Sequence, residues 1–107
     1  MKLPDQIQAY FDGKNARDPN LALSGFAAGA IVGDEARKHR GHQEIAAWMA
    51  ETSKKYNELS EPLESREEPD AIVVVAKVRG TFPGSPAKLR YRFTFAGDSI
   101  QTLEIGS

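Results

Sequence analysis

Residues 26–49 read FAAGAIVGDEARKHRGHQEIAAWM, and this stretch decides the fold. The apolar run at 30–32 predicts a strand over residues 30–34 that ends on Asp34. We expect a turn at 35–37, a brief return strand over 38–40, and a helix over about 42–56. The inward stripe of this helix is formed by positions 45, 48, 49, 52 and 56. Asp34 therefore stands between a short apolar strand and an amphipathic helix, where a lone carboxylate can serve as a base.

Two further helices are predicted before this stretch. The first covers about residues 4–15, where inward-facing side chains recur at helical spacing: Leu3, Ile7, Tyr10, Phe11 and Lys14. The pair Asp18-Pro19 is typical of an N-cap followed by proline at the first helical position. A short second helix is therefore expected over residues 19–26.

From residue 59 onward the apolar period becomes that of extended chain. We expect strands over residues 59–67, 71–82, 88–96 and 100–105, separated by Pro- and Gly-containing turns. The last two strands are joined by the two-residue turn Gly97-Asp98, which is typical of a β-hairpin. Helices followed by antiparallel strands indicate an α+β fold in which the sheet curls around the helices, as one domain over residues 1–107.

Composition excludes several classes of protein. The chain has 107 residues, with 14 Lys and Arg against 15 Asp and Glu, so it lacks the positive field that nucleic acid or an anionic membrane would require. It has no cysteine, which excludes disulfides and a cysteine nucleophile. No apolar run approaches the ~20 residues that span a bilayer, and the amino terminus MKLPDQIQAY carries no signal-peptide core. We expect a cytoplasmic protein that binds neither nucleic acid nor membrane.

The strand predicted over residues 71–82 is apolar on both faces. Val73 and Val75 lie opposite the face that carries Ile72, Val74 and Val78. An antiparallel strand with one wet face normally alternates, so the second face should be covered as well. We expect a homodimer that packs sheet against sheet, and the alternative is that the two valines lie under a loop.

The order of these elements and the position of Asp34 resemble the SnoaL-like branch of the nuclear transport factor 2 superfamily, which includes ketosteroid isomerases and polyketide cyclases. The resemblance implies a cone-shaped, curved antiparallel sheet wrapped around three helices, with a pocket inside the cone. It also implies that Asp34, at the end of the first strand, matches the general-base aspartate of the isomerases. Tyr10, 24 positions earlier, matches their oxyanion-binding tyrosine.

The chain departs from the isomerases at a second position. Where they hold a protonated aspartic acid as a second oxyanion donor, this sequence has Tyr91. The resemblance therefore implies a reaction that begins with proton removal, such as isomerisation, cyclisation or dehydration, on a small hydrophobic substrate. The remaining pocket residues are expected to be Phe26, Trp48 and Phe93.

Each of these assignments has a structural alternative. Tyr10 is also suited to an ordinary core position, and Asp34 to a strand end where it accepts hydrogen bonds from the following turn. The whole chain is equally compatible with a non-catalytic ligand-binding or dimerisation module of the same fold.

Other chemistries have no support in the sequence. His39 and His42 are too few for a catalytic zinc site, which takes three protein ligands. No glycine lies between a strand and a helix in a dinucleotide-binding pattern, and no nucleophile elbow is present. We therefore expect no metal and no cofactor.

Overall fold

The fold consists of one six-stranded sheet and three helices. The structure is a computed structural model that describes residues 1–107. In chain order its elements are α1 (Asp5–Ala16), α2 (Pro19–Leu23), β1 (Phe26–Asp34), β2 (Arg37–Arg40), α3 (Gly41–Tyr56), β3 (Leu59–Glu68), β4 (Ala71–Arg79), β5 (Ala87–Ala96) and β6 (Ser99–Gly106). The expected α+β class is confirmed. None of the three helices combines the length and the apolar character needed to cross a bilayer.

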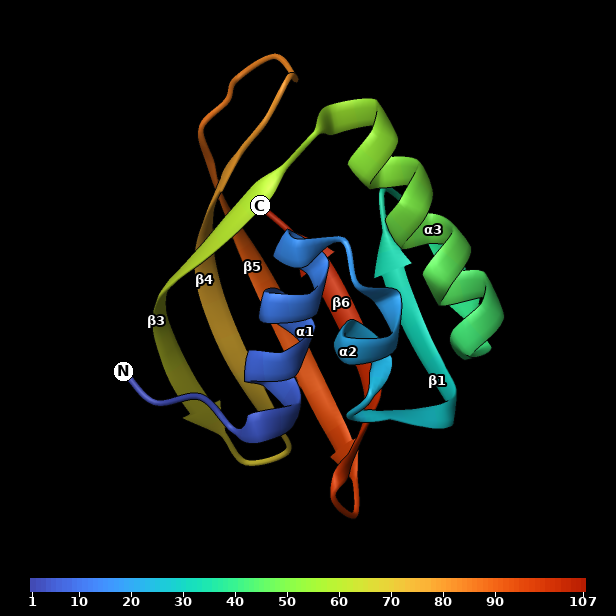
Figure 1. The fold of residues 1–107 in the computed structure, drawn as a ribbon. Coiled ribbons are helices and arrows are strands. Elements are labelled where there is room, and N and C mark those ends of the chain that lie inside the picture. Colours follow the sequence, from blue (N-terminus) through green and yellow to red (C-terminus); the bar gives the residue numbers. More distant parts are fainter.

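The strands follow the order β2-β1-β6-β5-β4-β3. All neighbouring strands are antiparallel except β1 and β6, which run parallel. The expected antiparallel sheet therefore contains one parallel pair. A parallel pair is possible here because no hairpin joins these two strands. Figure 1 shows α1 and α2 against one face of the sheet and α3 alongside β1, so the helices and the sheet enclose the interior.

The sheet curves around α1 because regular pairing is interrupted at several points. The register shifts in β3 between Pro62 and Glu64, and again between β5 and β6, where Thr94 pairs with Thr102 and Phe95 with Ile100. Such bulges increase the local bend and twist of a strand. Pro62 is tolerated because β3 is an edge strand. The concave face of this curved sheet then packs on α1 in one hydrophobic core of 19 buried residues.

Two element boundaries differ from the sequence expectation. The second helix ends at Leu23 rather than at Phe26, and Phe26 instead begins β1 and pairs with Ile100. The chain leaves the helix at Gly25, where an added Cβ would lie 2.5 Å from Cβ of Gln6. The carbonyl of Gly25 also accepts the Ile100 N–H at 2.8 Å, and this tertiary bond extends the strand by several residues.

The fourth strand, expected over residues 71–82, ends at Arg79. Gly80 passes close to the end of α3, since an added Cβ would lie 2.6 Å from the carbonyl oxygen of Tyr56. The Thr81 N–H then donates to the same oxygen at 2.7 Å. The chain is therefore pinned to α3 instead of continuing in the sheet, and Phe82 is left facing the interior of the cone.

β4 lies between β3 and β5, and its outer face carries Val73 and Val75. Val73 pairs across the sheet with Arg66 on one side and Arg92 on the other, and Val75 pairs with Arg90. These long side chains can lay their aliphatic stems over the valines. Val73 is only 9 % exposed.

Candidate functional site

A cavity of about 530 Å³ opens between α1, α3 and the concave face of the sheet. Half of its 16 lining residues are hydrophobic, and its polar residues include three acidic side chains and one basic side chain. The apolar and aromatic wall comprises Trp48, Tyr56, Val78, Phe82, Leu89, Tyr91 and Ile105. Its size is typical of a site for a small organic molecule.

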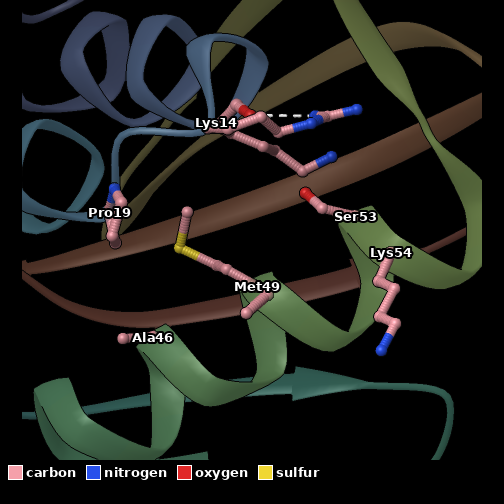
Figure 2. A pocket seen from close by; sticks show the side chains of 8 residues that line it. Lys14, Pro19, Ala46, Met49, Ser53 and Lys54 are labelled. Carbon is pink, nitrogen blue, oxygen red and sulfur yellow. Dashed lines mark hydrogen bonds between the residues drawn. The ribbon is translucent and has the colours of Figure 1, made fainter.

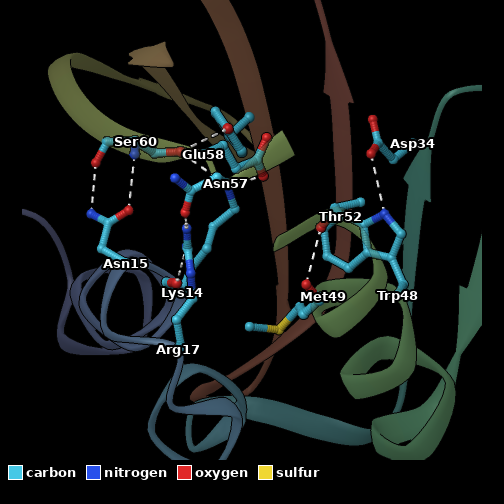
Figure 3. Close-up of polar contacts among 11 residues, drawn as sticks. Lys14, Asn15, Arg17, Asp34, Trp48, Met49, Thr52, Asn57, Glu58 and Ser60 are labelled. Carbon is cyan, nitrogen blue, oxygen red and sulfur yellow. Dashed lines mark hydrogen bonds and ion pairs between the residues drawn. The ribbon is translucent and has the colours of Figure 1, made fainter. Parts of the chain in front are cut away.

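Asp34 ends β1 on one wall of this cavity, as the sequence predicted. The indole Nε1–H of Trp48 donates to its Oδ2 at 3.2 Å (Figure 3). No lysine or arginine forms an ion pair with Asp34; nearby Arg37 instead approaches Glu51 at 3.7 Å. The carboxylate is therefore held by one neutral donor rather than by a salt bridge.

The electrostatic surroundings of Asp34 disfavour its charged form. Burial raises the pKa of this carboxyl above its ordinary value, the Trp48 hydrogen bond opposes that effect, and the Glu35 and Glu58 carboxylates raise the pKa further. The Lys14 ammonium lowers the pKa, but it is the smallest of these influences. A carboxylate with incomplete solvation and no cationic partner is a stronger base than a solvated one. This is the property that a proton-abstracting group needs.

The side chain of Trp48 is buried and stacks on a histidine ring. The expected burial of Trp48 is confirmed, with 6 % of its surface exposed. The His39 ring from β2 stacks on it with the centroids 5.7 Å apart and the planes at 29°. His42 lies elsewhere, with Nε2 3.0 Å from the carbonyl oxygen of Phe26. No three side chains of the His, Asp and Glu types gather as metal ligands would.

The strained turn between β1 and β2 contributes two residues to the lining of the cavity. Glu35 and Ala36 connect β1 to β2 with φ of 53° and 63°, a pair of left-handed conformations that normally favours glycine or asparagine. The Tyr56 hydroxyl donates to Oε1 of Glu35 at 3.1 Å. Backbone strain of this kind is often retained next to functional sites. Here it places a second carboxylate beside Asp34.

The opposite wall holds a buried ammonium group that was not assigned a role from the sequence. Lys14 is 3 % exposed, and its Nζ donates to Oε1 of Glu58 at 2.6 Å and to Oγ of Ser60 at 3.0 Å. Oγ of Ser60 is in turn 3.5 Å from the Tyr91 hydroxyl. Asn15 fixes Ser60 through two hydrogen bonds with its backbone, at 2.7 and 2.9 Å (Figure 3).

Burial acts on the two titratable groups of this wall in opposite directions. It lowers the pKa of the Lys14 ammonium, and the Glu58 carboxylate opposes that shift. It raises the pKa of the Tyr91 hydroxyl, which is therefore a proton donor over the whole physiological range. The wall thus presents hydrogen-bond donors, whereas the Asp34 wall presents an acceptor.

The predicted site residues divide into two groups. Asp34, Trp48 and Tyr91 line the cavity together. Tyr10, Phe26 and Phe93 instead belong to the packed core beneath it, where the Tyr10 ring lies 5.8 Å from that of Phe26 and 5.9 Å from that of Phe93. The Tyr10 hydroxyl is buried without a hydrogen-bond partner.

One feature of the sequence could have identified the wall of the cavity that contains Lys14. Lys14 falls on the inward stripe of α1, seven residues after Ile7, at a position where an apolar side chain is normally found. A charged residue on that stripe must be paired, and its partners come from the connection after α3 and from the start of β3. The sequence alone does not specify that long-range pairing.

A second hollow lies between α1, α2 and α3 (Figure 2). It has a volume of about 350 Å³, and its eight lining residues include Pro19, Ala46, Met49 and Lys54. Lys14 is the only residue that lines both hollows. The second hollow contains no acidic side chain, so a candidate general base is found only in the first.

Comparison with solved structures finds close matches. A candidate polyketide cyclase from Sinorhizobium meliloti is 41 % identical, with a TM-score of 0.92 over 96 % of this chain and 94 % of that chain. A ketosteroid isomerase-like protein from Catenulispora acidiphila, in complex with trimethylamine, is 19 % identical, with a TM-score of 0.84 over 99 % and 87 % of the two chains. TerC, co-crystallised with polyporic acid, is 21 % identical, with a TM-score of 0.78 over 94 % and 87 %.

The last two likenesses show the fold alone. Other matching structures are described as nuclear transport factor 2-like and SnoaL-like proteins. No protein-family model and no curated protein matches the sequence.

Proposed function

Because the chain belongs to the SnoaL-like branch of the nuclear transport factor 2 superfamily, we propose that residues 1–107 form one domain that binds a small, largely apolar molecule and removes a proton from it. The observation that carries this proposal is Asp34, a partly buried carboxylate with a raised pKa and no cationic partner, on the wall of an aromatic-lined cavity. The reaction class is isomerisation, cyclisation or dehydration, each of which begins with removal of an acidic proton.

The nature of the cavity supports a small organic ligand. Aromatic side chains form much of its wall, and apolar surface in a concave site is the main source of affinity for such molecules. Two proteins of the same fold hold small molecules, polyporic acid in one and trimethylamine in the other. These two ligands differ in charge, so the ligand class must come from the residues of this chain.

In the proposed reaction Asp34 removes the proton and hydroxyl groups stabilise the charge that remains. Tyr91 lines the cavity and stays protonated, which suits it to donate a hydrogen bond to a developing oxyanion. Tyr10, which the resemblance matches to an oxyanion donor, is retained as a second proposed donor because its hydroxyl has no partner within the protein. It lies in the core beneath the cavity, so a ligand would have to displace lining side chains to reach it. Phe26 and Phe93 support the cavity floor from below rather than lining it.

The base can be tested without knowing the natural substrate. The probe is 5-nitrobenzisoxazole, in which removal of the ring C–H proton breaks the N–O bond and releases a coloured nitrophenolate. We expect the wild-type protein to accelerate this elimination with a rate that rises as Asp34 ionises. Asp34→Asn should lower the rate by about 10²-fold or more, which is the usual contribution of a general base.

The matched control is Glu35→Gln, which removes a carboxylate from the same turn and the same cavity. Its rate at a pH where Asp34 is ionised should stay within a few-fold of wild type. Equal rates for wild type and Asp34→Asn would contradict the catalytic proposal. If a ligand still bound in the cavity under those conditions, the domain would be a non-catalytic binding module.

We also propose that the domain forms a homodimer through the outer face of β4. The valines of this face lie among side chains of both signs, with Arg90 and Arg92 near Glu64 and Glu104. Such a face is complementary to a second copy of itself turned by a two-fold axis. It can contribute apolar contact and ion pairs to the same interface.

A further inference from the structure

We propose that Lys14 is a second catalytic group, which together with Tyr91 binds the oxygen atom that becomes negatively charged when Asp34 removes a proton. Glu58 and Ser60 are then positioning residues that hold the Lys14 ammonium at the cavity wall. This inference rests on the proposed function and extends it. It predicts that the ligand carries an oxygen whose anion is stabilised at the Lys14 end of the cavity.

The geometry leaves one Lys14 proton for a ligand. An ammonium group has three N–H donors, and two of them are used, toward Glu58 at 2.6 Å and Ser60 at 3.0 Å. The third has no acceptor in the protein, although the side chain is almost entirely buried. Because Lys14 lines the cavity, an oxygen atom of a bound molecule is the natural acceptor.

The same contacts leave the Tyr91 hydroxyl available. Lys14 donates to Oγ of Ser60, so the Ser60 hydroxyl proton is free to point at the Tyr91 oxygen. Tyr91 then keeps its own proton for the cavity. The contact between the two hydroxyl groups is long, at 3.5 Å, so Tyr91 is only weakly engaged within the protein. Two donors from different elements, α1 and β5, can therefore meet at one oxygen.

Charge movement during the reaction favours this arrangement. Before proton transfer, Asp34 carries the negative charge and the Lys14–Glu58 pair is formally neutral. After transfer, Asp34 is neutral and the charge lies on the ligand oxygen. An ammonium group with little access to water attracts that new charge more strongly than a solvated one. The proton thus leaves toward Asp34 while the electron pair moves toward Lys14.

The inference can be tested by binding alone, with 4-nitrophenolate as the probe. All variants carry Asp34→Asn, which gives the cavity the charge that it has after proton transfer. We expect saturable binding of the anion to Asp34→Asn, observed as quenching of Trp48 emission. Adding Lys14→Met together with Glu58→Gln, which leaves no lone buried carboxylate, should weaken this binding by about tenfold or more.

Two further variants sharpen the result. Lys54→Met removes a lysine from the neighbouring hollow and should leave the affinity for 4-nitrophenolate unchanged. Ser60→Ala keeps every charge but frees Lys14 from one of its two partners, so a loss of about threefold or more is expected. Ser60→Ala also decides the question if the double replacement at Lys14 and Glu58 fails to fold.

The inference would be overturned if Asp34→Asn showed no saturable binding of the anion, or if the variants at Lys14 and Ser60 bound it as tightly as the Lys54 control. Because no turnover is measured and Asp34 is already replaced, this result does not depend on the elimination assay. A protein that binds the anion through Lys14 but shows no Asp34-dependent rate would retain the anion site and lose the proposed reaction.

Discussion

At the scale of single residues, Asp34 and Lys14 show what a sequence can and cannot reveal. Asp34 could be singled out because it directly follows an apolar strand, and local pattern alone places it at the wall of the interior. Lys14 stood on the inward stripe of α1, but its role depends on Glu58 and Ser60, which lie more than 40 positions away. Long-range pairing of a buried charge leaves no local pattern.

The raised pKa of Asp34 has a consequence for stability. At pH values between the ordinary pKa of an aspartate and the higher pKa of Asp34 in the folded protein, the folded protein binds more protons than the unfolded chain. The stabilising contribution of Asp34 to the free energy of unfolding is therefore fully present at acid pH, where the carboxyl is protonated. This contribution is lost as the pH rises through the pKa of Asp34 in the folded protein. Near neutral pH the ionised carboxylate destabilises the fold.

We predict that Asp34→Asn raises the free energy of unfolding near neutral pH, because asparagine can still accept the Trp48 hydrogen bond without carrying a charge. The gain should disappear as the pH falls below the ordinary aspartate range. Urea unfolding of both proteins across this pH range measures the difference. A variant that is less stable than wild type at neutral pH would mean that the charged carboxylate supports the fold.

At the scale of elements, strands and helices with a strong apolar period were predicted well. The third helix and the last two strands fall within one residue of the expected bounds. One of the two boundary errors occurred at residues 26–29, where Phe-Ala-Ala-Gly as a whole has little intrinsic preference for a strand. Parallel pairing with β6, far along the chain, makes this segment extended. Tertiary contact, rather than local propensity, set that boundary.

The packing of α2 on α1 provides a prediction for this scale. A Cβ added at Gly13 would lie 2.2 Å from the backbone nitrogen of Ala22, so the two helices would have to separate. We predict that Gly13→Ala destabilises the fold by about 1–3 kcal/mol, although alanine normally favours a helix. Chemical denaturation measures the change.

The control for this prediction is Gly29→Ala in β1. An added Cβ there meets no atom within 4 Å, so the stability should change by less than about 1 kcal/mol. Equal stability of Gly13→Ala and wild type would show that α1 and α2 are not tightly packed. The Lys14 wall, which begins one residue later on α1, would then be less firmly fixed than we describe.

At the scale of the whole molecule, the outer face of the sheet governs assembly. We predict that the protein is a dimer of its 11.7 kDa chain and that replacing Val73 and Val75 with threonine shifts it toward the monomer. The reason is that both valines lie at the centre of a face rich in arginine, where a polar replacement is left poorly paired in the interface. Light scattering at a series of concentrations measures the shift.

Leu21→Thr is the matched control, because Leu21 is a 40 % exposed apolar residue on the helical side of the molecule. It should leave the molecular mass unchanged. A monomer at all concentrations, for wild type and variants alike, would contradict the dimer. In that case the arginine side chains of β3 and β5 would be sufficient cover for the two valines.

The proposed function depends most directly on Asp34 being a poorly solvated carboxylate without a cationic partner. Its pKa can be measured directly by carboxyl carbon NMR titration of the folded protein, with Asp34→Asn identifying the signal. We predict a pKa above the ordinary aspartate value, because burial is the largest influence on this group. A pKa at or below that value would contradict the account, since it would mean that hydrogen bonds or cations stabilise the charge and that Asp34 is a structural residue.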